Sequence, residues 1–455
     1  MRTIPNCISS RRSHAAWPLA ALLAAASVPA HALPSFARQT GEECAACHIG
    51  AFGPQLTPHG MKFKLGGYTD SNGKNDSLPV SAMLVESWFH TRKDQPPADG
   101  PNNKALIQEA SLFLAGRLSD HVGSFAQATW ADTGRRKLTL DNVDARYANT
   151  LQLAGKNTVL GVSFNNNPTV SDPFNTVPAW RFPYMATEMA PGPAASPIID
   201  GVLAGQVGGL AAYGLWNDSI YAELGGYRTL GRSFLENVNV LASTDNLDKI
   251  SGVAPYWRVG YFQDNHKSAW HVGMFGFDPN MKPGGAAGPS DKYRDLGVDA
   301  SFQYLGTRRH VFALNTAYIH EKRKFDASFD STCATPDAPC NLSGSVNRFD
   351  VSGSYHYDQT WGVSAGLFGV KGSEDSGLYS GVSTLNKPNS DGYILQADWT
   401  PWGKESSWGA PWANLRLGLQ YTGYTRFNGL KNNYDGTGRN ASDNNTLYAF
   451  AWATF

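Results

Sequence analysis

Residues 293–304 have the sequence YRDLGVDASFQY. From position 296 onward, the even-numbered residues are apolar or aromatic, while the odd-numbered residues are glycine or polar. Because successive side chains of a β-strand point to opposite faces, this pattern predicts a strand with one apolar and one polar face. The same alternation recurs in residues 393–399 and 413–421.

Sixteen stretches of this kind follow one another from residue 80 to the C-terminus. We place them at 80–91, 104–118, 121–132, 140–151, 157–166, 202–215, 218–229, 252–264, 267–278, 293–305, 308–321, 346–357, 360–371, 391–400, 412–425 and 445–455. The connections between them are alternately short and long, except that 401–411 is long for a short turn. An even number of strands with short turns on one side and long loops on the other is typical of outer-membrane barrels.

We therefore predict an all-β fold, a sixteen-stranded antiparallel outer-membrane β-barrel that spans residues 80–455. The alternative is a large periplasmic β protein with an apolar interior, which would not produce such a regular alternation of loop lengths. The apolar face of the barrel would contact outer-membrane lipid. Both chain ends would lie in the periplasm, and the long loops would be extracellular.

The first 32 residues have the features of a secretory signal peptide. Three arginines precede an apolar run, and Ala30-His31-Ala32 provides small residues at the cleavage spacing. The whole chain carries 38 basic and 38 acidic residues, so loss of those arginines would leave a net charge of −3. A chain with this net charge lacks the excess of basic residues that is typical of nucleic-acid-binding proteins.

The stretch Cys44-Ala45-Ala46-Cys47-His48 follows the signal peptide closely. Two cysteines two residues apart with a histidine directly after them form the attachment pattern of a c-type haem. A zinc site would need a second pair of ligands nearby, and a thioredoxin-like dithiol would need a βαβ context; the sequence has neither. We predict one covalent haem c held by Cys44 and Cys47, with His48 as its proximal ligand.

Residues 33–68 are predicted to form this monohaem cytochrome c segment, and residues 69–79 a linker to the barrel. So short a segment buries too little surface to fold alone. A sixteen-stranded barrel leaves an open lumen, so we expect the segment to plug it. Charged residues of the strands would line the lumen: Asp144, Arg146, Arg258, Asp295, Asp299, Asp398 and Arg416.

The second axial ligand of the haem stays open at this stage. Met61 and His59 are the candidates within the segment, and a barrel residue or an open site is the alternative. Arg38, Lys62 and Lys64 are candidate partners of the haem propionates, or basic residues that face an acidic lumen.

Two further cysteines, Cys333 and Cys340, lie in a proline-rich loop. We expect them to form a small disulfide in an oxidising compartment.

The segment resembles a known family, the fused outer-membrane cytochrome–porins that act as iron oxidases in iron-oxidising bacteria. The resemblance is carried by Phe36-Ala37-Arg38-Gln39-Thr40-Gly41, the Cys44–His48 motif, Leu56-Thr57-Pro58 and Phe63-Lys64-Leu65. It implies an iron oxidase-like electron transfer from extracellular Fe(II), through the haem, to a periplasmic cytochrome c or a similar carrier. The alternatives are a solute porin with a haem plug, and an electron conduit for another extracellular donor or acceptor.

Overall fold

The computed structural model describes residues 34–74, 78–95, 102–134, 136–335, 337–404, 406–409 and 412–455. The predicted signal peptide (residues 1–32) and part of the predicted linker lie outside these described residues.

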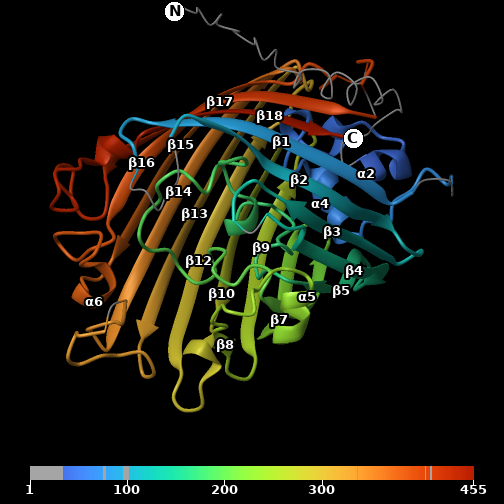
Figure 1. Ribbon diagram of the computed structural model, residues 1–455. Coiled ribbons are helices and arrows are strands. Elements are labelled where there is room, and N and C mark those ends of the chain that lie inside the picture. Colours follow the sequence, from blue (N-terminus) through green and yellow to red (C-terminus); the bar gives the residue numbers. More distant parts are fainter. Residues whose placement is uncertain are drawn as a thin grey trace, which may run out of the picture.

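Sixteen long strands of the described chain form one antiparallel sheet that closes on itself (Figure 1). The first strand, β1 (Val80–Thr91), pairs both with β2 (Lys104–Arg117) and with the last strand, β18 (Thr446–Thr454). The other long strands are β3 (Val122–Trp130), β4 (Thr139–Leu153), β5 (Lys156–Asn165), β6 (Val207–Trp216), β7 (Ile220–Thr229), β9 (Ala254–Asp264), β10 (Ser268–Phe277), β12 (Asp291–Tyr304), β13 (His310–Lys324), β14 (Ser343–Tyr357), β15 (Trp361–Gly372), β16 (Ser390–Trp399) and β17 (Asn414–Arg426). The predicted sixteen-stranded barrel is confirmed.

The strand bounds differ from the prediction in a few places. β6 begins at Val207 rather than at residue 202, because Gly201 and Gly205 adopt positive φ values of 81° and 74° in a series of turns. Two short strands, β8 (Lys249–Ile250) and β11 (Asn280–Lys282), pair with each other within the long loops.

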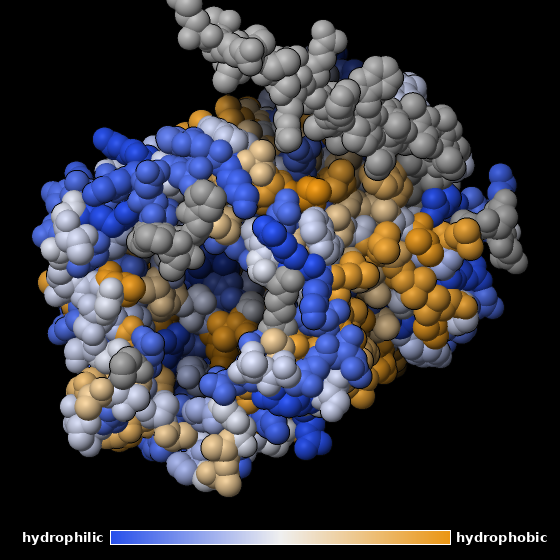
Figure 2. Space-filling model, in the orientation of Figure 1, coloured by the Kyte–Doolittle hydropathy of each residue, from blue (hydrophilic) through white to orange (hydrophobic). Residues whose placement is uncertain are grey.

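The alternation of side chains places the apolar face outside the barrel. On β12, Leu296, Val298 and Phe302 are 40–45% exposed, while Asp295 and Asp299 are buried. The same outward set includes Leu112 and Leu114 of β2, Leu160 and Val162 of β5, and Leu417 and Leu419 of β17. Figure 2 shows hydrophobic residues gathered over the outer surface of β3 to β5, and a mostly polar surface at the end with the long loops. A closed barrel with an apolar exterior satisfies its backbone groups within lipid, so this is an outer-membrane barrel.

Helices are few and short in the described residues: α2 (Pro34–Thr40), α3 (Cys44–Cys47), η1 (Ile49–Ala51), α4 (Pro58–Leu65), η3 (Pro178–Trp180), α5 (Arg232–Asn237), η4 (Pro283–Gly285), α6 (Ser376–Tyr379) and η5 (Ala441–Asn444). No helix in the described part of the chain is both long and apolar enough to cross a bilayer. The predicted disulfide is present, joining Cys333 to Cys340 in the loop between β13 and β14.

The N-terminal segment (residues 34–68), which contains α2, α3, η1 and α4, lies inside the barrel. Side chains from several strands bind its backbone. Arg416 of β17 donates to the carbonyls of Gly50 and Phe52, and Tyr213 of β6 donates to the carbonyl of Leu65 at 2.7 Å. The segment therefore occupies the lumen, as predicted.

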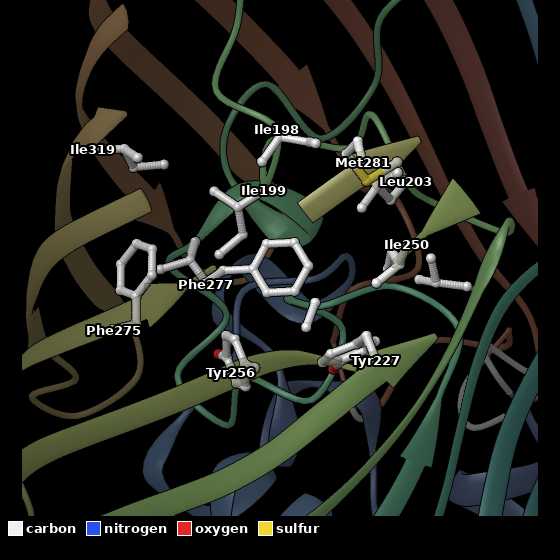
Figure 3. Packing of buried hydrophobic residues seen from close by; sticks show 13 residues of the cluster. Ile198, Ile199, Leu203, Tyr227, Ile250, Tyr256, Phe275, Phe277, Met281 and Ile319 are labelled. Carbon is white, nitrogen blue, oxygen red and sulfur yellow. The ribbon is translucent and has the colours of Figure 1, made fainter. Parts of the chain in front are cut away.

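A second piece of chain also fills the lumen. The inner loop (residues 166–206), which connects β5 to β6, folds inward and packs Ile198, Ile199 and Leu203 against the wall. Figure 3 shows this cluster, which also contains Tyr227, Tyr256, Phe275 and Phe277 of β7, β9 and β10.

The charged residues predicted to face the lumen are all buried, which confirms their direction: Asp144, Arg146, Arg258, Asp295, Asp299, Asp398 and Arg416. They do not line an open aqueous bore, however. Arg146 pairs with Asp144 at 2.9 Å, and Arg258 pairs with Asp172 of the inner loop at 3.1 Å and with Asp299 at 2.7 Å. The lumen is a packed interior held by ion pairs and hydrogen bonds.

Candidate functional site

The two cysteines of the motif form a single helical turn that α4 holds in place. The backbone N–H of His48 donates to the carbonyl of Cys44 at 2.9 Å, which closes the turn. Thr57 donates its hydroxyl to the carbonyl of Ala46 at 2.6 Å and its backbone N–H to the carbonyl of Cys47 at 2.9 Å. The Thr57 hydroxyl also accepts from the N–H of Gly60 at 3.2 Å and so caps α4. The motif thus sits in a rigid frame.

Gly60 allows α3 and α4 to approach closely. A Cβ atom at this position would lie 2.3 Å from the carbonyl oxygen of Cys47. No larger residue fits there without moving the motif.

Cys44, Cys47 and His48 line one large cavity between the N-terminal segment, the wall and the inner loop. Its volume is about 570 Å³, within the ~300–1,000 Å³ typical of ligand pockets. The rest of the lining is mainly apolar and aromatic, and includes Phe36, Phe52, Phe63, Met83, Phe113, Phe125, Trp180, Tyr184, Met185 and Trp452. Its basic residues are Lys64, Arg181 and Arg348. The lining also includes the carboxyl groups of Glu109 and Asp141. Its apolar part and its cationic groups fit a flat aromatic macrocycle that carries carboxylates.

The state of the motif residues also fits haem attachment. Burial lowers the pKa of His48 to about 4, so its ring is neutral and can coordinate a metal. Its Nδ1 atom makes no hydrogen bond of normal geometry in the described chain, although the Gly53 backbone is close. Burial raises the pKa of Cys44 to about 11 and that of Cys47 to about 12, so both thiols keep their protons at neutral pH. Neither cysteine is in a disulfide.

The two predicted second axial ligands lie away from this cavity. Met61 is buried with Leu65, Phe174 and Tyr213, and borders a separate, smaller cavity. His59 is exposed and lies 2.6 Å from a carboxylate oxygen of Glu42. Glu42, His59 and Cys47 together form a cluster whose possible metal-ligand atoms lie within 4.8 Å of one another.

Of the three predicted propionate partners, only Lys64 lines the cavity. Its ammonium group donates to the carbonyls of Val170 and Asp172 and to the side chain of Asn175, all in the inner loop. Arg38 donates to the carbonyl of Leu78 in the linker and to that of Val80 at the start of β1. Lys62 is exposed, with its Nζ atom 3.9 Å from Asp218.

Sequence reasoning did not find several lining residues. Arg181 of the inner loop and Arg348 of β14 supply cationic groups that share the carboxylate of Asp200. Met83 of β1 and Met185 of the inner loop are the methionines that line the cavity. The strand period puts Met83 and Arg348 on the inward face, but no local pattern marks the inner-loop residues.

The fold and the cavity together define the class of this protein. It is an outer-membrane barrel of porin type whose lumen holds its own N-terminal segment and an inward-folded loop.

Comparisons with known proteins find distant structural likenesses to outer-membrane proteins. No protein-family model and no curated protein sequence matches the chain. Among solved structures, the outer-membrane channel DcaP of Acinetobacter baumannii matches 83% of this chain and 97% of its own, at 10% identity and a TM-score of 0.49. OmpT of Vibrio cholerae (84% and 98%, 10% identity, TM-score 0.42) and Salmonella typhi OmpF (83% and 98%, 11% identity, TM-score 0.45) are similar to a comparable extent. At these scores the strand pairing, rather than the likeness, carries the fold assignment.

Proposed function

We propose that this protein is an outer-membrane electron-transfer protein with one covalent haem c in its lumen. It would accept electrons from extracellular Fe(II) and pass them to a periplasmic cytochrome c or a similar carrier. The single observation that carries this proposal is that Cys44, Cys47 and His48 line one large apolar cavity inside a membrane barrel.

The residues around the cavity fit the roles that such a cofactor requires. The thiols of Cys44 and Cys47 would form the thioether bonds, and the neutral ring of His48 would be the proximal ligand. Lys64, Arg181 and Arg348 are the cationic groups on the lining, and they would balance the propionates. The haem, when bound, supplies one-electron chemistry, and the surrounding residues tune its potential through burial and hydrogen bonds.

The filling of the lumen favours electron transfer over solute transport. Two segments cross the interior and are tied to the wall through buried side chains such as Arg416 and Arg258. Chain that fills a lumen hinders the passage of ions and solutes, whereas electrons can cross a packed protein. By the general rule for outer-membrane barrels, the short turns face the periplasm and the long loops face the exterior.

The experiment is expression together with a cytochrome c maturation system, followed by reconstitution into vesicles. We expect one haem that stays on the polypeptide after denaturation, rapid reduction of that haem by external Fe(II), and low ion conductance. A protein without covalent haem, or a haem that Fe(II) does not reduce, would overturn the proposal. High conductance would support the solute porin instead.

A further inference from the structure

The chain that follows the motif turns back on itself directly beside His48. The backbone N–H of Ile49 donates to the carbonyl of Gln55 at 2.9 Å, and His48 pairs with Leu56 in an antiparallel bridge. We call residues 49–55 the proximal loop. It begins at the residue next to the proposed proximal ligand, so its shape bears directly on that ligand.

The backbone of the proximal loop is unusual. Gly50, Ala51 and Gly53 adopt positive φ values of 67°, 65° and 109°. Such values are common for glycine, but the side chain of Ala51 disfavours them. A residue keeps a conformation of this kind only where the surrounding structure fixes it. The contacts that fix the proximal loop come from the barrel wall.

Two buried side chains of β17 bind three successive carbonyls of the proximal loop. The Nη2 atom of Arg416 donates to the carbonyl of Gly50 at 3.0 Å and to the carbonyl of Phe52. The Nδ2 atom of Asn414 donates to the carbonyl of Ala51 at 3.2 Å. With these carbonyls held, the direction of the peptide unit that follows them is also set.

Neighbouring strands hold the proximal loop as well. The ring of Phe52 packs on Trp452 of β18, with 4.5 Å between the ring centres, and the guanidinium of Arg416 lies over both rings at 5.5 and 5.9 Å. The ring of His356 of β14 lies so close to Gly50 that a Cβ atom there would overlap it. The barrel therefore grips the loop from three strands.

The loop that is held in this way lies beside an unpaired nitrogen of His48. The Nδ1 atom of His48 is buried and makes no hydrogen bond of normal geometry, and the backbone of Gly53 lies within reach of the ring. Gly53 directly follows the three carbonyls that β17 binds, and it lines the same cavity as His48. A metal-binding histidine commonly donates its second ring N–H to a backbone carbonyl, which fixes the ring and makes it more basic.

We infer that Arg416 and Asn414 are positioning residues for the proximal histidine. They hold the proximal loop so that the carbonyl of Gly53 accepts the Nδ1–H of His48. This inference deepens the proposed function and rests on it, because it concerns the ligand of the haem. A more basic histidine stabilises Fe(III) relative to Fe(II), so the barrel wall lowers the reduction potential of the haem.

The test compares the wild type with the double variant Arg416→Met, Asp398→Asn, both as full chains matured with haem. Asp398 of β16 lies 3.6 Å from Arg416, so the double variant leaves no unpaired buried carboxylate and keeps the net charge. At the wild-type midpoint potential, we expect its ratio of reduced to oxidised haem to be at least threefold higher by spectroelectrochemistry. An unchanged or lower ratio would overturn the inference.

A matched control removes a similar pair from the same two strands. Arg426 of β17 pairs with Asp391 of β16 near the long loops, so Arg426→Met, Asp391→Asn should leave the ratio unchanged. An equal shift in this control would show a general effect of losing a pair, and would overturn the inference.

Two single variants separate positioning from charge. Arg416→Lys should keep the wild-type ratio, because an ammonium group can donate to two carbonyls, as that of Lys64 does in this lumen. Asn414→Leu removes one bond to the proximal loop and no charge, so it should raise the ratio in the same direction as the double variant. Asn414→Leu also decides the question if the double variant does not assemble, and no shift in it would then overturn the inference.

A second arm needs no haem and uses full chains expressed without the maturation system. Hydrogen exchange of a peptide that covers residues 48–56 reports the bond between Ile49 and Gln55. We expect at least tenfold faster exchange in the double variant Arg416→Met, Asp398→Asn than in the wild type, and no change in the Arg426 control. Equal exchange would show that the wall does not hold the loop. A wild-type chain that takes up no haem would overturn the proposed function, while the exchange result would still decide the role of the wall.

Discussion

The N-terminal segment and the inner loop fill the same lumen but are held there in different ways. Barrel side chains bind the N-terminal segment mainly through its backbone carbonyls, as Arg308 does at Ala45 (2.8 Å) and Gln303 at Leu56 (2.7 Å). Barrel side chains also bind the backbone of the inner loop, as Arg323 does at Ser196 (2.7 Å), but this loop in addition forms buried ion pairs with the wall, as Asp172 does with Arg258. The difference is therefore that the inner loop adds buried charges to contacts of the kind that both pieces of chain make.

The largest effect that tests this contrast is expected from the double variant Cys44→Ser, Cys47→Ser. Covalent haem should be lost completely, because both thioether bonds disappear. The segment should stay docked and the barrel should assemble, since most docking contacts, such as those of Arg416 and Tyr213, are made to the backbone and a serine can keep the contact of Cys44 with Asn414. A haem stain after denaturing electrophoresis and the heat-dependent migration of the folded barrel measure the two outcomes. Loss of the folded barrel would contradict the view that docking depends on backbone contacts.

The next largest effect is expected from Arg258→Leu. This change leaves Asp172 and Asp299 buried without their cation, which should lower the free energy of unfolding by about 3–5 kcal/mol. The inner loop should also detach, so ion conductance in planar bilayers should rise. Denaturant unfolding in detergent gives the stability.

A matched control is Arg232→Leu, which removes the exposed pair with Glu236 in α5. Its effect should stay below about 1 kcal/mol. Equal losses for the two variants would mean that the inner loop does not depend on its buried pairs.

A pH-dependent effect is expected at Lys64, which ties the two regions together. Burial lowers the pKa of Lys64 to about 7 from its ordinary value of 10.5. Between these values the unfolded chain binds more protons than the folded chain, so the free energy of unfolding should rise as the pH increases from 7 to 10.5. Lys64→Met should flatten this rise, while Lys62→Met, at an exposed site, should not. Denaturant midpoints at pH 7 and pH 10 provide the comparison, and identical slopes in all three proteins would contradict it.

The same contrast explains how much the sequence alone could predict. The barrel and the direction of residues such as Asp299 and Arg416 follow from a period of two, which depends only on neighbours in the chain. The motif at Cys44 is equally local. The path of the inner loop could not be predicted in this way, because it depends on partners such as Arg258 and Arg348 that are far away in the sequence.

The bulge in β2 shows a second limit. Counting back along β2 from the inward-facing Phe113 reaches Ser111 and Glu109 correctly, but the bulge then adds Gln108 and shifts the phase by one residue. The sequence around Gln108 contains no glycine or proline that marks this shift. The direction of residues beyond such a bulge therefore could not be predicted from periodicity alone.

The smallest effect is expected from Met61→Leu. This variant tests whether the second axial ligand of the haem comes from the N-terminal segment or from the rest of the lumen. Met61 borders a different cavity from His48, whereas Met83 and Met185 line the cavity of His48. Met61→Leu conserves volume in a packed cluster, so it should cost less than about 1.5 kcal/mol and leave the haem spectrum unchanged. If the thioether ligand comes from outside the segment, Met83→Leu or Met185→Leu should abolish the charge-transfer band of ferric haem that methionine ligation produces. A spectral change in Met61→Leu alone would return the ligand to the N-terminal segment and would mean that the haem lies on the other side of α4.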